Sequence, residues 1–480
     1  MFTHETYYKA LLSHDSRFDG VFFIGVTSTH IYCRPICRVK VPQQKNCRFF
    51  LNAASAEQAG FRPCMRCRPE LSPGYSIQNN HTAKTAARLI DKGFLQEKTL
   101  EDLAQEVSLS QRHLRRSFQE YWGVSPVAYS QTKKLLLAKQ LLSETTLPVT
   151  TIAFSAGFSS LTRFNELFKT RYKLSPRDLR KQIEKKDHSE TMQLFVDYRL
   201  PFAWSELIRF LEGRTISGVE QVSNNSYSRT VSLTRNDKKY EGWILVQNDE
   251  KHARLLVTMP ENLAPVTAIL LARVRQLFDT NCSPQDIRMQ LGELATEVAG
   301  LRVSGAFDGF EMAVRAILGQ QITVAGARTL AGRVASEFGD SIPTPFETIQ
   351  KTFPSPQQIV DAGAERLGKL GITRTRAQTI CDLAQAVLDK KIYLYPKGEI
   401  DSSFTQLRLI KGIGEWTVQY IAMRALEWPD AFPSTDYGVK KALGETNDKI
   451  ILQKAEKWRP WRAYATMYLW NKLARKEVRV

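Results

Sequence analysis

Apolar positions divide the chain of 480 residues into segments with different periods. Two polar breaks, near residues 72–80 and 181–190, enclose a segment in which apolar residues recur at helical spacing. Over residues 192–260 they alternate in short runs, which predicts strands joined by polar turns such as residues 222–228. After residue 301 the helical spacing returns, so we expect several structurally different parts.

The segment between the two breaks contains an internal repeat. The first copy carries Leu103, Ala104, Leu109, Phe118 and Ser125-Pro126, and the second carries Ile152, Ala153, Phe158, Phe168 and Ser175-Pro176. The offset is 49 residues at the start of the repeat and 50 residues later. Two copies predict a duplicated helical module, because a solenoid needs at least three.

The chain carries a formal net charge of +18, which is concentrated toward its N-terminus. Residues 1–190 hold 29 Lys/Arg and 17 Asp/Glu, a balance of +12, whereas residues 191–480 hold 38 and 32, a balance of +6. A basic surface is typical of proteins that bind nucleic acid, although charge alone is equally compatible with a protein that is merely soluble. The sequence contains neither a signal-peptide pattern nor a long apolar run, so we expect neither export nor a membrane span.

Five of the seven cysteines are crowded near the N-terminus. Cys33 and Cys37 form a C-x3-C pair, and after 26 residues Cys64 and Cys67 form a C-x2-C pair. This spacing predicts a tetrahedral four-thiolate Zn²⁺ site in a reducing compartment, and not a disulfide framework. Most such sites only stabilise a fold. However, residues 31–68 contain eight Lys/Arg and one acidic residue, which favours a module that faces a polyanion.

The N-terminal part, about residues 1–75, resembles the zinc domain of Ada-type alkylation-response proteins. The resemblance rests on two runs, IYCRPICR at residues 31–38 and GFRPCMRC at residues 60–67. It implies that Cys33 accepts a methyl group from a DNA methylphosphotriester, while the other three paired cysteines hold the metal with it. Because the transfer is irreversible, such a protein is a stoichiometric sensor.

The same resemblance places several residues against DNA. Thr29, Arg38 and Arg62 lie at positions that touch DNA in the family. Lys40 stands where the family has Arg, which makes bidentate phosphate contacts that Lys does not make. Cys47 lies outside the cysteine spacing, and we expect it to be an ordinary buried or surface thiol.

Residues 81–180 resemble the two helix-turn-helix units of AraC-type regulators. The resemblance rests on TLEDLA at residues 99–104, on AF at 153–154 and on GFSS at 157–160. A turn before a polar, Arg-bearing helix suits a recognition helix in the major groove. The candidate DNA contacts are Arg112, His113 and Arg116 in the first unit and Ser160, Thr162, Arg163 and Asn165 in the second. A plain helical bundle with solvated charges is the alternative.

The C-terminal part, about residues 192–475, resembles the AlkA-type 3-methyladenine glycosylases of the helix-hairpin-helix family. The matching runs are AILGQQ at residues 316–321, KGIGEWTV at 411–418, PSTDY at 433–437, RPWR at 459–462 and Tyr464-Ala465. Backbone N–H groups in the hairpin of Gly412 and Gly414 can point at a DNA phosphate without a side chain. Gln321 falls where the family's wedge fills the space of a flipped base, at a position where the best-known relative has Leu.

Asp436 is the candidate catalytic carboxylate. Hydrolysis of an N-glycosidic bond builds positive charge on the sugar, and a carboxylate beneath the sugar stabilises that oxocarbenium ion. The alternative for a single Asp is a helix N-cap, because a helical pattern follows it. Bifunctional relatives have a Lys two residues after the second hairpin glycine. Trp416 stands there in this chain, so the resemblance implies a monofunctional hydrolase without strand cleavage.

Three aromatic residues, Trp416, Tyr420 and Trp470, match positions of the family's base pocket. An N3- or N7-alkylated purine is cationic, so electron-rich rings attract it over neutral bases. For any one of the three, a place in the ordinary core is the alternative.

Together these features predict a multidomain α+β protein. Its expected parts are a zinc domain (1–77), an all-α double helix-turn-helix (81–183), an α+β glycosylase subdomain with a small antiparallel sheet (191–300) and a mainly α helix-hairpin-helix subdomain (301–480). The Pro-Cys-His-Arg run that marks an O6-methylguanine methyltransferase domain is missing from the sequence, so that repair activity is not expected.

The predicted protein repairs and senses DNA alkylation, with glycosylase activity and a methyl-triggered transcriptional response. Its expected cofactor is Zn²⁺. Its expected partners are alkylated DNA, promoter DNA and RNA polymerase, and no membrane is expected as a partner. The expected location is a bacterial-type cytoplasm, in association with the nucleoid. The rival interpretation is a zinc-dependent transcription regulator whose C-terminal half is inactive.

Overall fold

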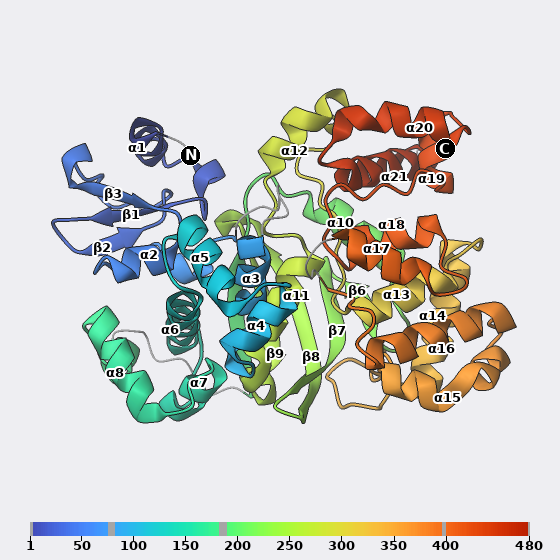
Figure 1. The fold of residues 1–480 in the computed structure, drawn as a ribbon, viewed down its shortest axis with the longest axis horizontal. Helices are drawn as coiled ribbons and strands as arrows, with labels where there is room; N and C mark the ends of the chain where they lie inside the picture. Colours follow the sequence, from blue (N-terminus) through green and yellow to red (C-terminus); the bar gives the residue numbers. More distant parts are fainter. Residues whose placement is uncertain (1–2, 75–81, 182–189, 396–399, 479–480) are drawn as a thin grey trace. The chain divides into compact units, whose positions relative to one another are not determined.

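A computed structural model describes residues 3–74, 82–181, 190–395 and 400–478 (Figure 1). Most of the two predicted polar breaks, at residues 72–80 and 181–190, lies outside the described residues.

The chain forms two compact units. The first consists of residues 1–200, 233–240 and 248–272, and the second consists of residues 201–232, 241–247 and 273–480. The boundaries of the four predicted domains stay predictions.

A four-stranded sheet of order β3-β1-β2-β4 organises the N-terminal part; Figure 1 labels its first three strands. Its elements are α1 (His4–Leu12), β1 (Phe23–Val26), β2 (Ile31–Cys33), β3 (Cys47–Phe50), α2 (Ala53–Gln58) and β4 (Arg62–Pro63). Strand β1 is antiparallel to β2 and β3, whereas β4 runs parallel to β2. Phe22, Ile24 and Tyr32 are almost fully buried and contribute to the small core of this part.

The duplicated helical module forms as the repeat predicts. Its helices are α3 (Thr82–Asp91), α4 (Leu100–Glu106), α5 (Gln111–Trp122), α6 (Pro126–Glu144), α7 (Val149–Ser155), α8 (Leu161–Tyr172) and α9 (Pro176–Lys181). Helices α4 and α5 form one helix-turn-helix and α7 and α8 form the other, with α6 between them along the chain. Ser125 caps α6 by accepting the Ala128 N–H at 3.2 Å, and proline follows at the first helical position, where it needs no hydrogen-bond partner.

A five-stranded sheet of order β5-β9-β8-β7-β6 follows. Its strands are β5 (Thr191–Asp197), β6 (Glu220–Ser223), β7 (Ser226–Arg235), β8 (Lys238–Asp249) and β9 (Arg254–Pro260). The predicted turn within residues 222–228 is a two-residue hairpin turn at Asn224 and Asn225, whose φ angles are 49° and 57°. Helix α10 (Trp204–Glu212) lies between β5 and β6, inside the subdomain that was predicted as α+β. The apolar pattern did not mark this helix, because nine residues are too few for helical spacing to stand out against the neighbouring strands.

Of the remaining described helices, all but the first contribute to one large hydrophobic core within residues 216–469. They are α11 (Thr267–Leu277), α12 (Pro284–Leu291), α13 (Gly309–Leu318), α14 (Val324–Phe338), α15 (Pro356–Lys369), α16 (Arg374–Leu388), α17 (Ile400–Arg408), α18 (Glu415–Arg424), α19 (Tyr437–Leu443), α20 (Asp448–Ala455) and α21 (Arg462–Val478). Helix α13 packs against α14, α16 and α18. The central helix α13 therefore supports the helix that begins at the hairpin.

The predicted fold class, a multidomain α+β protein, is confirmed. Among the described helices, none is long and apolar enough to cross a membrane.

Candidate metal centre and candidate active site

The parallel pairing of β2 with β4 brings the two cysteine pairs together. Tyr32 lies opposite Pro63, so Cys33, the last residue of β2, and Cys64, which follows β4, lie at the same end of the sheet. Tight turns then return the second cysteine of each pair to this point. All four sulfur atoms lie within 4.8 Å of one another. The predicted clustering of Cys33, Cys37, Cys64 and Cys67 is confirmed.

Four sulfur donors at these separations fit a tetrahedral Zn²⁺ ion. A Zn–S distance of about 2.3 Å places the sulfurs of such a tetrahedron about 3.8 Å apart. Cys67 is partly exposed, whereas the other three cysteines are buried. Four thiolates this close would repel one another, and a bound dication removes that repulsion.

The residues that were predicted to touch DNA in this part are accessible. Thr29, Arg38 and Lys40 are exposed, and Arg62 is half-buried. Thr29 lies in the turn between β1 and β2. The next residue of that turn, His30, accepts the Arg62 backbone N–H through its carbonyl oxygen at 2.9 Å. The side chains can therefore reach a phosphate, while the contacts themselves stay predictions.

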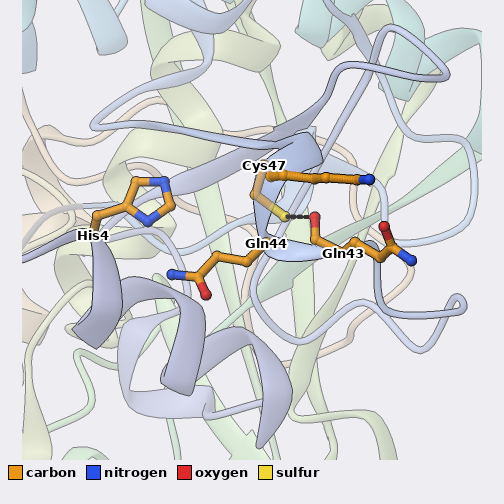
Figure 2. A pocket seen from close by; sticks show the side chains of 5 residues that line it. His4, Gln43, Gln44 and Cys47 are labelled. Carbon is orange, nitrogen blue, oxygen red and sulfur yellow. Dashed lines mark hydrogen bonds between the residues drawn. The ribbon is translucent and has the colours of Figure 1, made fainter.

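Cys47 is the cysteine of this part that stays outside the cluster. It borders a pocket that is also lined by His4, Gln43, Gln44 and Lys45 (Figure 2). Its thiol donates to the Gln43 carbonyl at 3.4 Å, and burial raises the pKa of this thiol. A protonated thiol is a weak nucleophile. Cys47 is thus a buried structural thiol and an unfavourable methyl acceptor.

In both helix-turn-helix units the second helix presents cationic side chains to solvent. Arg112 and Arg116 are exposed on α5, and Arg163 is exposed on α8. Arg116 lies 3.4 Å from Glu120 and Arg163 lies 3.6 Å from Glu166, in exposed pairs that contribute little to stability. Either arginine can therefore exchange its carboxylate for a phosphate. The other candidates, His113, Ser160, Thr162 and Asn165, are exposed as well.

The turns of the two units explain part of their sequences. Ser108 and Gly157 occupy equivalent turn positions, with φ of 57° and 90°. This left-handed backbone favours glycine, so the second unit uses the residue that tolerates it and the first unit bears some strain. Ser110 and Ser160 then cap α5 and α8.

The hairpin between α17 and α18 uses its two glycines differently. Gly412 has φ of 96°, and a Cβ there would meet the Thr379 hydroxyl at 2.2 Å, so the turn requires glycine. Gly414 is the N-cap of α18, with an ordinary φ of −89°; it is exposed and has open space around its missing Cβ. Packing therefore explains why the chain has glycine at Gly412. At Gly414 packing does not require glycine, and the open space lets an external group approach the backbone closely.

The carboxylate of Asp436 accepts three hydrogen bonds. Its Oδ2 accepts from the Trp416 indole at 2.9 Å, and its Oδ1 accepts from the Trp470 indole at 2.8 Å. Oδ1 also accepts the Val439 backbone N–H at 3.0 Å, which makes Asp436 the N-cap of α19. The cap and the candidate catalytic position are thus one residue, half-buried and oriented from both sides by indoles.

The predicted aromatic residues form a continuous group around this carboxylate. The rings of Trp416 and Tyr420 stack with centroids 5.1 Å apart, and those of Tyr420 and Trp470 lie 6.2 Å apart. Phe210 of α10 stacks on Trp470 at 6.2 Å with an interplanar angle of 10°. Sequence reasoning missed Phe210, because it lies more than 200 residues before the other rings and no motif marks it.

A buried arginine behind the rings was also missed. Arg424 is 1% exposed, and its Nη1 donates to the Tyr420 hydroxyl at 2.9 Å. Burial raises the pKa of Tyr420, but Arg424, together with Arg214 and Arg315, lowers it below its ordinary value. Because the arginine occupies a lone pair of this oxygen, the hydroxyl proton is free to serve another acceptor.

Gln321 lies in the loop between α13 and α14. It is exposed and has φ of 53°, a left-handed conformation that is uncommon for a residue other than glycine. The neighbouring Gln320 donates to the Gly412 carbonyl and to the Thr417 hydroxyl, each at 2.9 Å. The predicted wedge is therefore presented by a strained loop that is tied directly to the hairpin.

Comparison with known families finds a match in every part of the chain. Residues 6–70 match the metal binding domain of Ada, and residues 103–182 match a helix-turn-helix domain. Residues 191–308 match the AlkA N-terminal domain, and residues 314–454 match the HhH-GPD superfamily base excision DNA repair protein. The four matched families do not include an O6-methylguanine methyltransferase domain.

One curated relative extends over almost the whole chain. It is the "Probable bifunctional transcriptional activator/DNA repair enzyme AlkA" of Mycobacterium tuberculosis (strain H37Rv), which is 33% identical over 98% of this chain and 96% of the relative. The chain belongs to this family of bifunctional activator and repair proteins.

Two relatives correspond to the two halves of this bifunctional family. "DNA-3-methyladenine glycosylase 2" of Escherichia coli (strain K12) is 34% identical over 57% of this chain and 95% of the relative. "Bifunctional transcriptional activator/DNA repair enzyme Ada" of the same organism is 35% identical over 32% of this chain and 43% of the relative. The predicted fusion of an Ada-type half with an AlkA-type half is confirmed, and the four-cysteine cluster is a Zn²⁺ site.

Proposed function

We propose that this protein excises alkylated bases through Asp436 and senses DNA methylation through Cys33. The observation that carries the excision activity is the carboxylate of Asp436, held by two indoles at 2.9 and 2.8 Å beside a group of aromatic rings. The observation that carries the sensing activity is the cluster of four sulfurs within 4.8 Å in a basic N-terminal part.

In the excision reaction the N-glycosidic bond breaks and water adds to the sugar carbon. The carboxylate of Asp436 stabilises the positive charge that develops on the sugar, and it is already oriented when the substrate binds. Trp416, Tyr420, Trp470 and Phe210 offer ring faces to a flipped base, which favours the cationic alkylated purines such as 3-methyladenine. Gln321 fills the space that the base leaves, and Gly412 and Gly414 bring backbone N–H groups to a phosphate.

The enzyme is a monofunctional glycosylase. Strand cleavage by this class of enzyme needs a lysine amine that forms a Schiff base with the sugar. The position two residues after Gly414 holds Trp416, whose indole donates to Asp436. We therefore expect an intact strand with an abasic site as the product.

In the sensing reaction the Cys33 sulfur attacks the methyl carbon of a neutral methylphosphotriester. A carbon–sulfur bond forms, the carbon–oxygen bond breaks, and the phosphate leaves as an ordinary diester anion. Bound Zn²⁺ keeps the four cysteines as thiolates at neutral pH. The site loses one negative charge, which strengthens its attraction to DNA and favours promoter binding through Arg112, Arg116 and Arg163.

The phosphate backbone beside Cys33 is proposed to be held by four residues, Thr29, Arg38, Lys40 and Arg62. Their accessible positions support this proposal. A methyl-triggered activator acts on transcription, so RNA polymerase is the expected protein partner. Because both substrates are DNA, we propose that the protein lies in the bacterial cytoplasm, in association with the nucleoid.

One incubation tests both activities. The purified full-length protein is mixed with methylated duplex DNA, and free bases are measured by chromatography while the methylated peptide is located by mass spectrometry. We expect release of 3-methyladenine and one methyl group on Cys33. Asp436→Asn should strongly reduce only the first signal, and Cys33→Ser should abolish only the second. A methyl group on Cys47, or methyl-dependent DNA binding without any base release, would contradict the respective assignment.

A further inference from the structure

Arg34 ties the two cysteine pairs to each other. It follows Cys33 directly and is 3% exposed. Its backbone N–H donates to the Cys67 sulfur at 3.3 Å, and its Nη1 donates to the Cys67 carbonyl oxygen at 3.1 Å. This one arginine therefore links Cys67 of the second pair to the residue next to Cys33 in the first pair.

Two carboxylates compensate the buried charge of Arg34. Asp19 accepts from Nε at 2.8 Å and also from Nη2, and Asp197 accepts from Nη1 at 2.7 Å. The side chains of Arg34, Asp19 and Asp197 are 4%, 6% and 13% exposed. Removing one partner of a buried pair is strongly destabilising, because the other charge stays buried without compensation.

Asp197 does not come from the sensor part of the sequence. It is the last residue of β5, within the segment that matches the AlkA N-terminal domain. Arg199, just after the strand, reaches the same place, where its Nε donates to the Asp19 carbonyl at 2.9 Å. The end of β5 thus contacts both the arginine beside Cys33 and the loop that holds this arginine.

A second connection leads from the other cysteine pair to the same strand. Arg68 follows Cys67 and donates to Glu144 of α6. Glu144 in turn accepts the Phe195 backbone N–H at 3.1 Å, and the neighbouring Gln140 donates to the Phe195 carbonyl at 2.9 Å. Strand β5 is an edge strand of its sheet, so these side chains satisfy backbone groups that would otherwise lack a partner.

We propose that Asp197 is a positioning residue of the methyl-acceptor site, so that strand β5 of the AlkA-like segment completes the sensor. The proposal rests on the proposed methyl transfer to Cys33. Asp197 acts through Arg34, which it holds in the orientation that fixes Cys67 against Cys33. Groups that orient metal ligands from outside change metal affinity by about 10- to 100-fold when they are removed.

The test uses full-length zinc-loaded protein and the variant Asp197→Asn, which keeps the shape of the side chain but loses its charge. We expect Zn²⁺ release to an excess of chelator to be about tenfold faster or more. The Co²⁺-substituted variant should show an altered thiolate-to-metal absorption band, and methyl transfer to Cys33 should slow. Asp197→Glu should restore slow metal release. Asp178→Asn, an exposed carboxylate that bonds to Ser175, is the matched control and should behave as wild type.

The outcomes separate this proposal from the proposed function. Metal release and an absorption band identical to wild type in Asp197→Asn would overturn the positioning role. If Asp197→Asn releases metal faster but the wild-type protein transfers no methyl group, the positioning role stands and the sensing function is overturned. Base release measured on the same samples reports whether the rest of the chain is folded, and it should stay near the wild-type rate.

Discussion

At the scale of single residues, Asp436 combines the helix cap that it forms with the catalytic role that we propose for it, although the sequence presented the two as alternatives. Its Oδ1 caps α19 through the Val439 N–H, while Oδ1 and Oδ2 each accept an indole N–H. A cap needs one acceptor oxygen, and two indole partners on the remaining lone pairs go beyond that need. The extra hydrogen bonds favour a carboxylate whose orientation matters for more than helix stability.

Asp436→Asn should slow single-turnover excision of 3-methyladenine by at least about 100-fold, or roughly 3 kcal/mol, because it removes a preorganised charge. Asn remains a good cap, but its single oxygen cannot serve both indoles, so the free energy of unfolding should fall by only about 1 kcal/mol. DNA affinity should stay the same or rise. Excision within a few-fold of wild type would remove Asp436 from the mechanism.

Trp470→Phe separates the indole N–H from the ring face. The variant keeps an aromatic surface for the base but leaves Oδ1 of Asp436 without its 2.8 Å donor. Because hydrogen bonds to charged groups contribute about 1.5–3 kcal/mol, excision should slow by about 10- to 100-fold with little change in DNA affinity. Trp458→Phe, a buried tryptophan of the same core, is the control for lost packing. Equal rates in the two variants would show that the N–H is dispensable.

At the scale of elements, the hairpin between α17 and α18 separates folding from binding. Gly412→Ala should lower the thermal midpoint, because its Cβ would lie 2.2 Å from the Thr379 hydroxyl at a φ of 96°. Gly414→Ala meets open space at an ordinary φ, so the midpoint should stay unchanged. If a phosphate approaches the backbone there, Gly414→Ala should nevertheless weaken binding to abasic-site DNA. Unchanged binding would remove Gly414 from the proposed DNA contacts.

The packing of α2 against α6 and α8 predicts a pH dependence. Glu57 of α2 accepts hydrogen bonds from Tyr32, Thr132 and Tyr172, and burial raises its pKa to about 7. The folded state therefore favours the protonated acid.

The stabilising effect of this group is complete below its ordinary pKa of 4.5 and is lost as the pH rises through about 7. The thermal midpoint of the wild type should decrease as the pH is raised from 5.5 to 8. The side chain in Glu57→Gln cannot ionise, so the midpoint of this variant should decrease less over the same range. Arg171 is the nearby charge that opposes the shift. The same decrease in both proteins would exclude Glu57 as its source.

At the scale of the whole molecule, the chain combines a part that holds a four-sulfur metal site with a part that is organised around a large hydrophobic core. Cys64→Ser removes one of the four sulfur ligands and should reduce bound zinc from about one ion per chain to almost none. Because metal binding supplies much of the folding free energy of small zinc modules, residues 3–74 should become sensitive to protease. Base excision should persist. Full zinc content in the variant, by elemental analysis, would contradict the four-sulfur site.

The sequence by itself determined the local features of this protein. The two cysteine pairs predicted the sulfur cluster, because ligand spacing within a tight turn is set by the chain itself. The offset of about 50 residues predicted the duplicated helices, and in the structure the Ser-Pro dipeptides of the repeat coincide with the beginnings of α6 and α9. The hairpin glycines and Asp436 were named through a family resemblance in short runs of consecutive residues, and their roles stay proposals.

Only the tertiary structure decided which distant residues meet. Phe210 joins the aromatic group from α10, and Asp197 of β5 reaches the arginine beside Cys33, although neither residue lies near a motif. Periodicity reports which face of an element is buried but not which partner covers it. Hydrogen bonds and stacking depend on distances between elements, and those distances follow from packing of the whole core.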